Sequence, residues 1–353
     1  MKCYILTAIA LYTLTNVTVM AESLKVSFIA PMTGPQAVFS AAARNGIEMA
    51  LDELRTPGAA AIEVNYQDSA LPGFNLDGFF KGLSGSSRPD LLLLVSRELA
   101  EHAAKLSEAA RIPLIAWSDD SHITDKRPHV LRSWLAAGSE SQALVQEAAK
   151  RRYRNIFILS SDTPGMLEVA INLSRKLPDG SVLARRQTSA LRNDFREIIQ
   201  EAQSLNASAF ALFLEPGQYA AFATQLKEAR TTASIFGSIL LYNREEVRQA
   251  GFSLSGAWFS FLPVSEQFEQ AYVRRFVGES AISLGGFHHD LMKHLARIPP
   301  AQRSTDALLS VLLSPLEQSG VIGNYRFSEE NGDRCLRART GIKQITDEGF
   351  ENL

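Results

Sequence analysis

Short apolar runs alternate with longer amphipathic runs along most of the 353-residue chain, and no other feature of the sequence restricts its fold as strongly. Residues 90–96 (DLLLLVS) are almost entirely apolar, which predicts a central strand covered on both faces. Residues 41–54 instead place Ala43, Ile47 and Leu51 on one face of a helix. Strands that alternate with helices build parallel sheets with helices on both sides, so the sequence predicts an α/β fold.

The alternation occurs in two successive series, which predicts two lobes of similar architecture. The strands expected in the first series are 24–30, 62–66, 90–96 and 113–117, and those in the second are 155–160, 182–185, 208–214 and 235–241. The tail continues with a strand at 256–262, helices at 266–277, 288–297 and 305–318, and a segment at 320–326. No linker rich in Pro, Gly or Ser separates the series, which indicates lobes joined by several crossing strands.

The first residues have the layout of a secretory signal peptide. A basic start at Lys2 precedes an uncharged run over residues 4–20, and the small residues Val19 and Ala21 precede Glu22. A membrane anchor is the alternative, but Thr and Asn interrupt the uncharged run. We therefore expect residues 1–21 to be removed and the remaining chain to be a soluble periplasmic protein.

Composition and missing motifs exclude several classes of protein. The net charge of −2, without a basic block, argues against a nucleic-acid partner. Cys335 would be the one cysteine after removal of the signal peptide, so we expect no internal disulfide and a structural role for this thiol. The chain has no G-x-S-x-G, P-loop, H-E-x-x-H or G-x-G-x-x-G motif. These observations predict a protein that is not an enzyme and has no cofactor.

Three stretches in order make the chain resemble the type I periplasmic solute-binding proteins of the leucine/isoleucine/valine-binding group. The first comprises residues 25–35 (KVSFIAPMTGP) and 44–54 (RNGIEMALDEL), which are similar to the opening strand, loop and helix of that family. The second is residues 112–116 (IPLIA), and the third is residues 320–333, which are similar to its G-x-x-G-x-x-x-F-x-x-x-G-D element. Together they cover nearly the whole chain after the signal peptide.

The resemblance implies two Rossmann-like lobes that are joined by three crossover segments and close on a small molecule. The implied first lobe comprises residues 22–135 plus 262–325, and the second comprises residues 136–261 plus 326–353. Ligands of open α/β sheets bind beyond the carboxyl ends of the strands, which agrees with a site in the cleft between the lobes. Closure about the hinge would then bury the ligand.

The resemblance also implies positions that contact the ligand in the first lobe. The matching residues are Thr33, Phe39, Ser96, Ser118 and Asp119, the last beside a second aspartate. Each has a structural alternative. Thr33 would cap a turn, Phe39 would belong to the core, Ser96 would end a strand, and the aspartate pair would be a solvated helix cap.

In the second lobe the resemblance implies contacts from Asp162 and Tyr219. The aromatic residue that the family has near Pro164 is absent here, and no carboxylate follows Gly237 to hold an ammonium group. A buried ammonium without a counter-charge costs several kcal/mol. We therefore expect a neutral or weakly anionic, partly apolar ligand rather than a simple amino acid.

The run His288-His289-Asp290 lies where the family shows Tyr-Asp at a helix start near the cleft. Asp290 and His294 are spaced four residues apart, as on one face of a helix, which permits a metal site. No partner motif supports a metal, so we expect Asp290 to cap a helix and His289 to face the cleft, with surface histidines as the other alternative.

The function that the resemblance implies is capture of a small molecule and its delivery to the membrane permease subunits of an ABC-type importer. The alternative is a periplasmic sensory or accessory protein with the same fold and no transport role.

Overall fold

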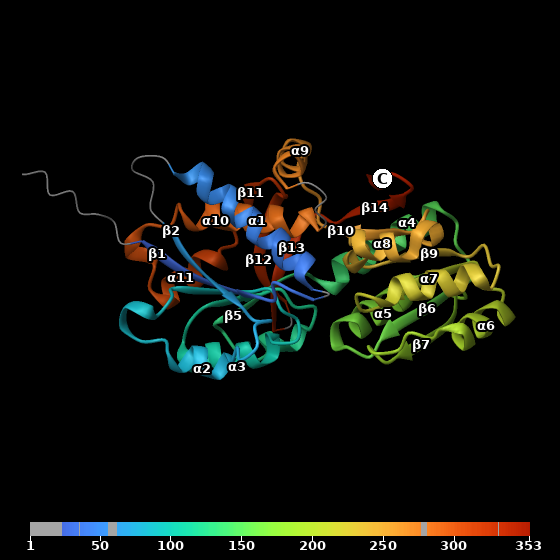
Figure 1. Ribbon diagram of the computed structural model, residues 1–353, viewed down its shortest axis with the longest axis horizontal. Helices are drawn as coiled ribbons and strands as arrows, with labels where there is room; N and C mark the ends of the chain where they lie inside the picture. Colours follow the sequence, from blue (N-terminus) through green and yellow to red (C-terminus); the bar gives the residue numbers. More distant parts are fainter. Residues whose placement is uncertain (1–22, 35, 56–61, 277–280, 331) are drawn as a thin grey trace, which may run out of the picture.

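The computed structural model describes residues 23–34, 36–55, 62–276, 281–330 and 332–353 (Figure 1). The expected signal peptide and its cleavage site at Glu22 lie outside the described residues. The chain forms two α/β lobes that lie side by side (Figure 1). None of the described helices is long and apolar enough to cross a membrane.

The first lobe is built on an eight-stranded sheet in the order β11-β12-β13-β5-β4-β3-β1-β2. Its strands are β1 (Leu24–Ala30), β2 (Ile62–Asp68), β3 (Leu91–Leu94), β4 (Leu114–Ala116), β5 (Val130–Leu135), β11 (Gln318–Gly320), β12 (Gly323–Glu330) and β13 (Asp333–Ala338). Strands β2, β1, β3, β4, β5 and β13 run parallel, while β11 and β12 are antiparallel additions at one edge. The helices of this lobe are α1 (Ala37–Leu54), α2 (Leu76–Lys81), α3 (Ala100–Ala110), α9 (Glu266–Arg275), α10 (Ile282–Leu295) and α11 (Thr305–Leu312).

The second lobe is built on a seven-stranded sheet in the order β15-β14-β10-β9-β8-β6-β7. Its strands are β6 (Ile156–Ser161), β7 (Val182–Thr188), β8 (Ala209–Phe213), β9 (Ser234–Gly237), β10 (Trp258–Phe261), β14 (Gly341–Thr346) and β15 (Gly349–Asn352). The helices are α4 (Ala137–Lys150), α5 (Pro164–Lys176), α6 (Arg196–Ser204), α7 (Gln218–Glu228) and α8 (Arg244–Ala250). The parallel strands β7, β6, β8, β9 and β10 confirm the predicted α/β class.

The chain passes between the two sheets three times, after β5, after β10 and after β13. The third crossing differs from the expected boundary at 325/326, because β12 and β13 both belong to the first sheet. The reason lies in β5, where the guanidinium of the buried Arg132 donates to Asp333 at 2.8 and 2.6 Å. This ion pair fixes β13 beside β5, so the chain leaves the first lobe only after Ala338.

Helix α10 begins at Ile282, six residues before the expected helix start at 288. Asp290 therefore lies inside the helix and does not cap it, contrary to the expectation from the sequence. Its carboxylate instead accepts hydrogen bonds from the backbone N–H groups of Val321 and Ile322, both at 2.9 Å. The aspartate thus ties the loop between β11 and β12 to α10.

Candidate functional site

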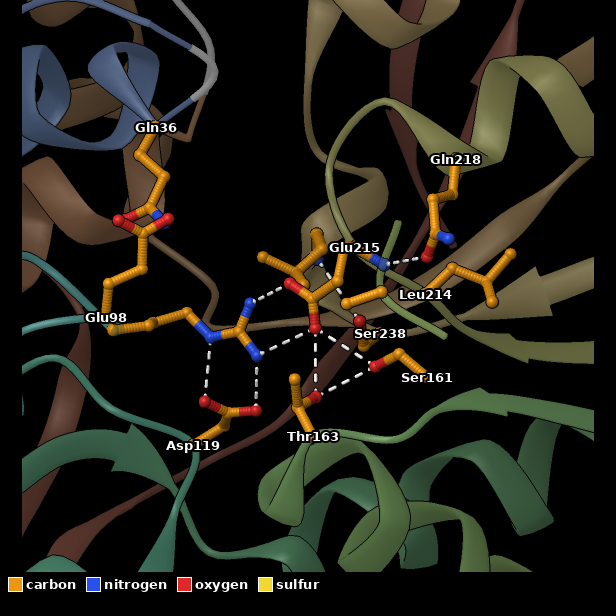
Figure 2. Close-up of polar contacts among 12 residues, drawn as sticks. Gln36, Glu98, Asp119, Ser161, Thr163, Leu214, Glu215, Gln218 and Ser238 are labelled. Atoms are coloured by element: carbon orange, nitrogen blue, oxygen red, sulfur yellow. Dashed lines mark hydrogen bonds and ion pairs between the residues drawn. The ribbon is translucent and has the colours of Figure 1, made fainter. Parts of the chain in front are cut away.

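Polar side chains follow four strands whose carboxyl ends meet between the lobes. Arg97 follows β3 and Asp119 follows β4 in the first lobe, whereas Thr163 follows β6 and Glu215 follows β8 in the second. Figure 2 shows Asp119 of the first lobe opposite Thr163 and Glu215 of the second. This is the position at which parallel α/β sheets bind ligands.

Arg97 joins the two lobes. Its Nε and Nη2 donate to the two carboxylate oxygens of Asp119 at 2.7 and 2.6 Å. Its Nη1 and Nη2 donate to Glu215 of the other lobe, the second contact at 3.3 Å. We call Arg97, Asp119 and Glu215 the interlobe ion cluster (Figure 2).

The interlobe ion cluster is withdrawn from solvent, since 9% of the Arg97 side chain is exposed. Burial opposes the charged form of Arg97, but Asp119 and Glu215 outweigh it and hold the pKa of this guanidinium above its ordinary value. Arg97 is therefore a permanent cation, and it faces two carboxylates.

Glu215 is held in place by its own lobe. The hydroxyls of Ser161 and Thr163 donate to its Oε1 at 3.0 and 2.9 Å, and the Gln218 side chain accepts from its backbone N–H at 2.9 Å (Figure 2). These contacts satisfy carboxylate oxygens that face Arg97. The second lobe therefore presents a preformed anionic group to the first.

The lobes touch directly beside the cluster. Gly165 is the second residue of α5, and a Cβ atom at this position would lie 2.4 Å from the side chain of Asp119. Only a residue without a side chain permits this approach. The Asp119 carboxylate consequently lies close to the first turn of α5, where the helix dipole favours negative charge.

Three aromatic rings of the first lobe pack beside the cluster. The ring centroids of Phe39 and Trp117 are 4.8 Å apart, and those of Trp117 and Trp134 are 4.7 Å apart. The Arg97 guanidinium carbon lies 5.8 Å from the centre of the Trp134 ring, within the range of a cation–π contact. The site therefore combines a charged part and an aromatic part.

Three of the residues predicted from the resemblance, Ser96, Ser118 and Asp119, lie in the loops that carry the interlobe ion cluster, and Thr33 lies in the loop after β1. Asp119 is a member of the cluster, and Ser118 precedes it and accepts from the Asp120 backbone N–H at 3.2 Å. Ser96 is buried before Arg97, and it lines a cleft of about 220 Å³ in the first lobe together with the exposed Thr33. Their contact with a ligand stays a prediction.

Three other predicted residues, Phe39, Asp162 and Tyr219, have partners within the protein, and their contact with a ligand stays a prediction. Phe39 is 1% exposed and belongs to the core. Asp162 is exposed and accepts from the Ala190 backbone N–H at 3.1 Å. Tyr219 is fully buried, where its hydroxyl accepts from the Leu214 N–H at 3.0 Å.

His289 lies at the other end of α1 from the cleft, because its Nε2 is 3.1 Å from Glu53 Oε1 near the C-terminus of that helix. It therefore does not face the cleft, contrary to the expectation from the sequence. Among the described residues no group of three His, Cys, Asp or Glu side chains is arranged to hold a metal.

Arg97 and Glu215 were not among the residues predicted from the sequence. Each is a charged residue that comes directly after or close to the end of a buried strand, a signal that can be found in the sequence. The resemblance implied a carboxylate after Gly237, at the end of β9, where this chain has Ser238. The second lobe instead supplies the carboxylate of Glu215 after β8. This finding weakens the argument against an amino-acid ligand that rested on a missing carboxylate.

The two sheets, the three crossings and the polar site between the lobes define a two-lobed binding protein of type I. The chain belongs to the periplasmic binding protein family, whose model matches residues 23–298. No curated protein matches the sequence.

Solved structures of solute-binding proteins share the fold at low sequence identity. The leucine-binding protein LivK of Thermotoga maritima is 17% identical with a TM-score of 0.78, and the match covers 94% of this chain and 97% of that one. LivJ of Streptococcus pneumoniae, solved with isoleucine, is 15% identical with a TM-score of 0.79, covering 94% and 99%. An ABC-transporter protein of Rhodopseudomonas palustris BisB5, solved with 3,4-dihydroxybenzoic acid, is 19% identical with a TM-score of 0.77, covering 94% and 96%. The fold is thus related to that of ABC-transporter solute-binding proteins.

Proposed function

We propose that the protein captures a small molecule between its lobes and delivers it to the permease subunits of an ABC-type importer. The observation that carries this proposal is the interlobe ion cluster, in which Arg97 of one lobe is bonded to Glu215 of the other. Contacts that bridge the lobes favour the closed form, and a ligand held by both lobes would favour it further.

The charges in the cleft oppose an anionic solute. Arg97 carries one positive charge, whereas Asp119 and Glu215 carry two negative charges, so the cluster is negative overall. An anion would compete with the two carboxylates for the one guanidinium. The structurally similar proteins that were solved with amino acids or hydroxybenzoates are too distant in sequence to indicate the ligand of this protein. We expect no micromolar binding of leucine, isoleucine or valine in calorimetry.

We also propose export and removal of residues 1–21, in agreement with the periplasmic family to which the chain belongs. N-terminal sequencing of the protein recovered from periplasm should begin at or near Glu22. Mature protein that retains Met1 would contradict this part of the proposal.

Native mass spectrometry of the protein purified from its own cells tests the binding function. A co-purified small molecule should raise the melting temperature of the stripped protein, because a ligand of the native state stabilises it in proportion to its concentration over its Kd. Uptake of that molecule should then fail in cells that lack the protein. Binding with unchanged uptake would instead favour a sensory or accessory role.

A further inference from the structure

A small cavity lies between the lobes next to the interlobe ion cluster. It offers about 30 Å³ to a water-sized molecule, and both lobes contribute to its lining. Trp117, Trp134 and Phe287 come from the first lobe, whereas Glu140 of α4 and Ser260 of β10 come from the second. We call this cavity the hinge pocket, because the chain crosses between the lobes after β5 and β10 at its walls.

Two buried polar atoms in the walls of the hinge pocket make no hydrogen bond of ordinary geometry to the described residues, although Trp134 and the Ile239 backbone lie close enough to the Glu140 carboxyl to lower its pKa. They are the Oγ of Ser133, a residue that is 6% exposed, and the Oε2 of Glu140, which is 1% exposed. The other oxygen of Glu140 accepts from the Ser260 hydroxyl at 2.7 Å. A buried polar atom without a partner is unfavourable, so these two atoms point to a missing hydrogen-bonding group.

The lining also restricts the charge of the missing group. Of the described residues that line the pocket, none is Lys, Arg or His, so nothing there neutralises an anion. Burial raises the pKa of Glu140 to about 7, which means that its surroundings favour the uncharged carboxylic acid. A cation would require the carboxylate form that this environment opposes.

We propose that the hinge pocket receives the apolar part and the hydroxyl group of a small uncharged solute, the hydroxyl bonding Ser133 Oγ and Glu140 Oε2. This inference rests on the proposed function and names the class of solute. A hydroxyl both donates and accepts, so a single group satisfies both atoms. The indole and phenyl rings supply the apolar contact, and parting of the lobes enlarges the pocket for entry.

Tryptophan fluorescence provides the readout, because two of the three tryptophans, Trp117 and Trp134, line the pocket. A Trp258→Phe background removes the third, which stacks on Phe236 in the second lobe. The probes are 1-propanol, propionate and propylamine, together with the corresponding benzyl alcohol, benzoate and benzylamine. We expect saturable changes with the alcohols and none with the acids and amines.

Ser133→Ala should weaken binding of the alcohols about 3- to 10-fold, the equivalent of one lost hydrogen bond. The matched control is Ser160→Ala, which removes another buried hydroxyl without a partner among the described residues, in β6 and away from the pocket. Glu140→Gln keeps a neutral hydrogen-bonding group, so binding of the alcohols should change less than about 3-fold.

Stronger binding of the amines, abolished in Glu140→Gln, would overturn the uncharged class. Equal affinity of Ser133→Ala and Ser160→Ala for the alcohols would show that Ser133 Oγ bonds no solute hydroxyl, and would overturn the inference. If a co-purified solute still binds and is indifferent to both changes, this inference fails while the proposed function stands. If no co-purified molecule and no probe binds, the proposed function fails as well.

Discussion

At the scale of a single residue, the burial of Phe39 supports a role in the core, and its contact with a ligand stays a prediction. The resemblance implied a ligand contact, but the side chain packs on Trp117 and is 1% exposed. Phe39→Ala should lower the free energy of unfolding of the free protein by about 3–5 kcal/mol, the range for a large buried aromatic residue. Urea denaturation measures this loss, and Phe252→Ala is the control because that ring is 73% exposed. Unchanged stability with lost solute binding would restore the ligand contact.

Glu140 gives the protein a specific dependence on pH. Burial raises its pKa from 4.5 in the unfolded chain to about 7 in the folded one. Below pH 4.5 both states hold the proton, so the group has no effect on stability. Between pH 4.5 and 7 the unfolded chain releases the proton first, so stability falls as pH rises, and above pH 7 the full cost of about 3 kcal/mol remains.

Glu140→Gln should therefore be about as stable as the original protein at pH 4.5 and about 2–4 kcal/mol more stable at pH 8. Denaturation at both pH values measures the difference, and the exposed Glu351→Gln serves as the control. A constant difference between the variant and the original protein across this range would contradict the assigned titration.

At the scale of elements, the sequence predicted the regular strands and helices well. The expected strand 24–30 coincides with β1, and the run 164–177 corresponds to α5 (Pro164–Lys176). The hydrophobic periodicity and the apolar content of a segment are local properties, so they predict a strand or a helix without knowledge of the fold. The loops after β3 and β4 were instead expected at the cleft from the family resemblance, and their residues Arg97 and Asp119 lie in the interlobe ion cluster.

The elements that were missed depend on distant partners. Strand β5 contains the buried Arg132, which is compatible with a sheet because Asp333, far along the chain, neutralises it. The first turns of α10 contain Gly285, a poor helix former whose place is set by its contact with Gly46 of α1. Arg97 and Glu215 likewise become a pair only once the lobes meet.

The docking of β13 on β5 gives a prediction at this scale. Asp333→Ala would leave the buried guanidinium of Arg132 without its carboxylate, and should cost about 3–5 kcal/mol of stability. Chemical denaturation measures the loss, with Glu330→Ala as the control because its pair with Arg337 is exposed on the neighbouring strand. The double change Arg132→Met with Asp333→Ala should recover much of the stability, since it removes both charges. A single variant as stable as the original would show that β13 does not depend on this pair.

At the scale of the whole molecule, the closed arrangement depends on the approach of Asp119 to Gly165. A methyl group at Gly165 would lie 2.4 Å from the Asp119 side chain, and the two residues belong to different lobes. The clash is relieved when the lobes part, whereas neither lobe needs to change internally. Alanine is also a better helix former than glycine, so α5 itself should not be weakened.

Gly165→Ala should therefore separate the lobes without unfolding them. Small-angle X-ray scattering should give a larger radius of gyration than for the original protein, with an unchanged circular dichroism spectrum. The control is Gly138→Ala, at the same second position of α4, where the nearest atom to an added Cβ is Lys176 Nζ at 3.8 Å. Affinity for the co-purified solute should fall in Gly165→Ala and not in Gly138→Ala. The clash in Gly165→Ala lowers the population of the closed form, and a solute that binds the closed form then binds more weakly. An unchanged radius of gyration together with unchanged affinity would mean that Asp119 moves aside locally and that the ion cluster does not control closure.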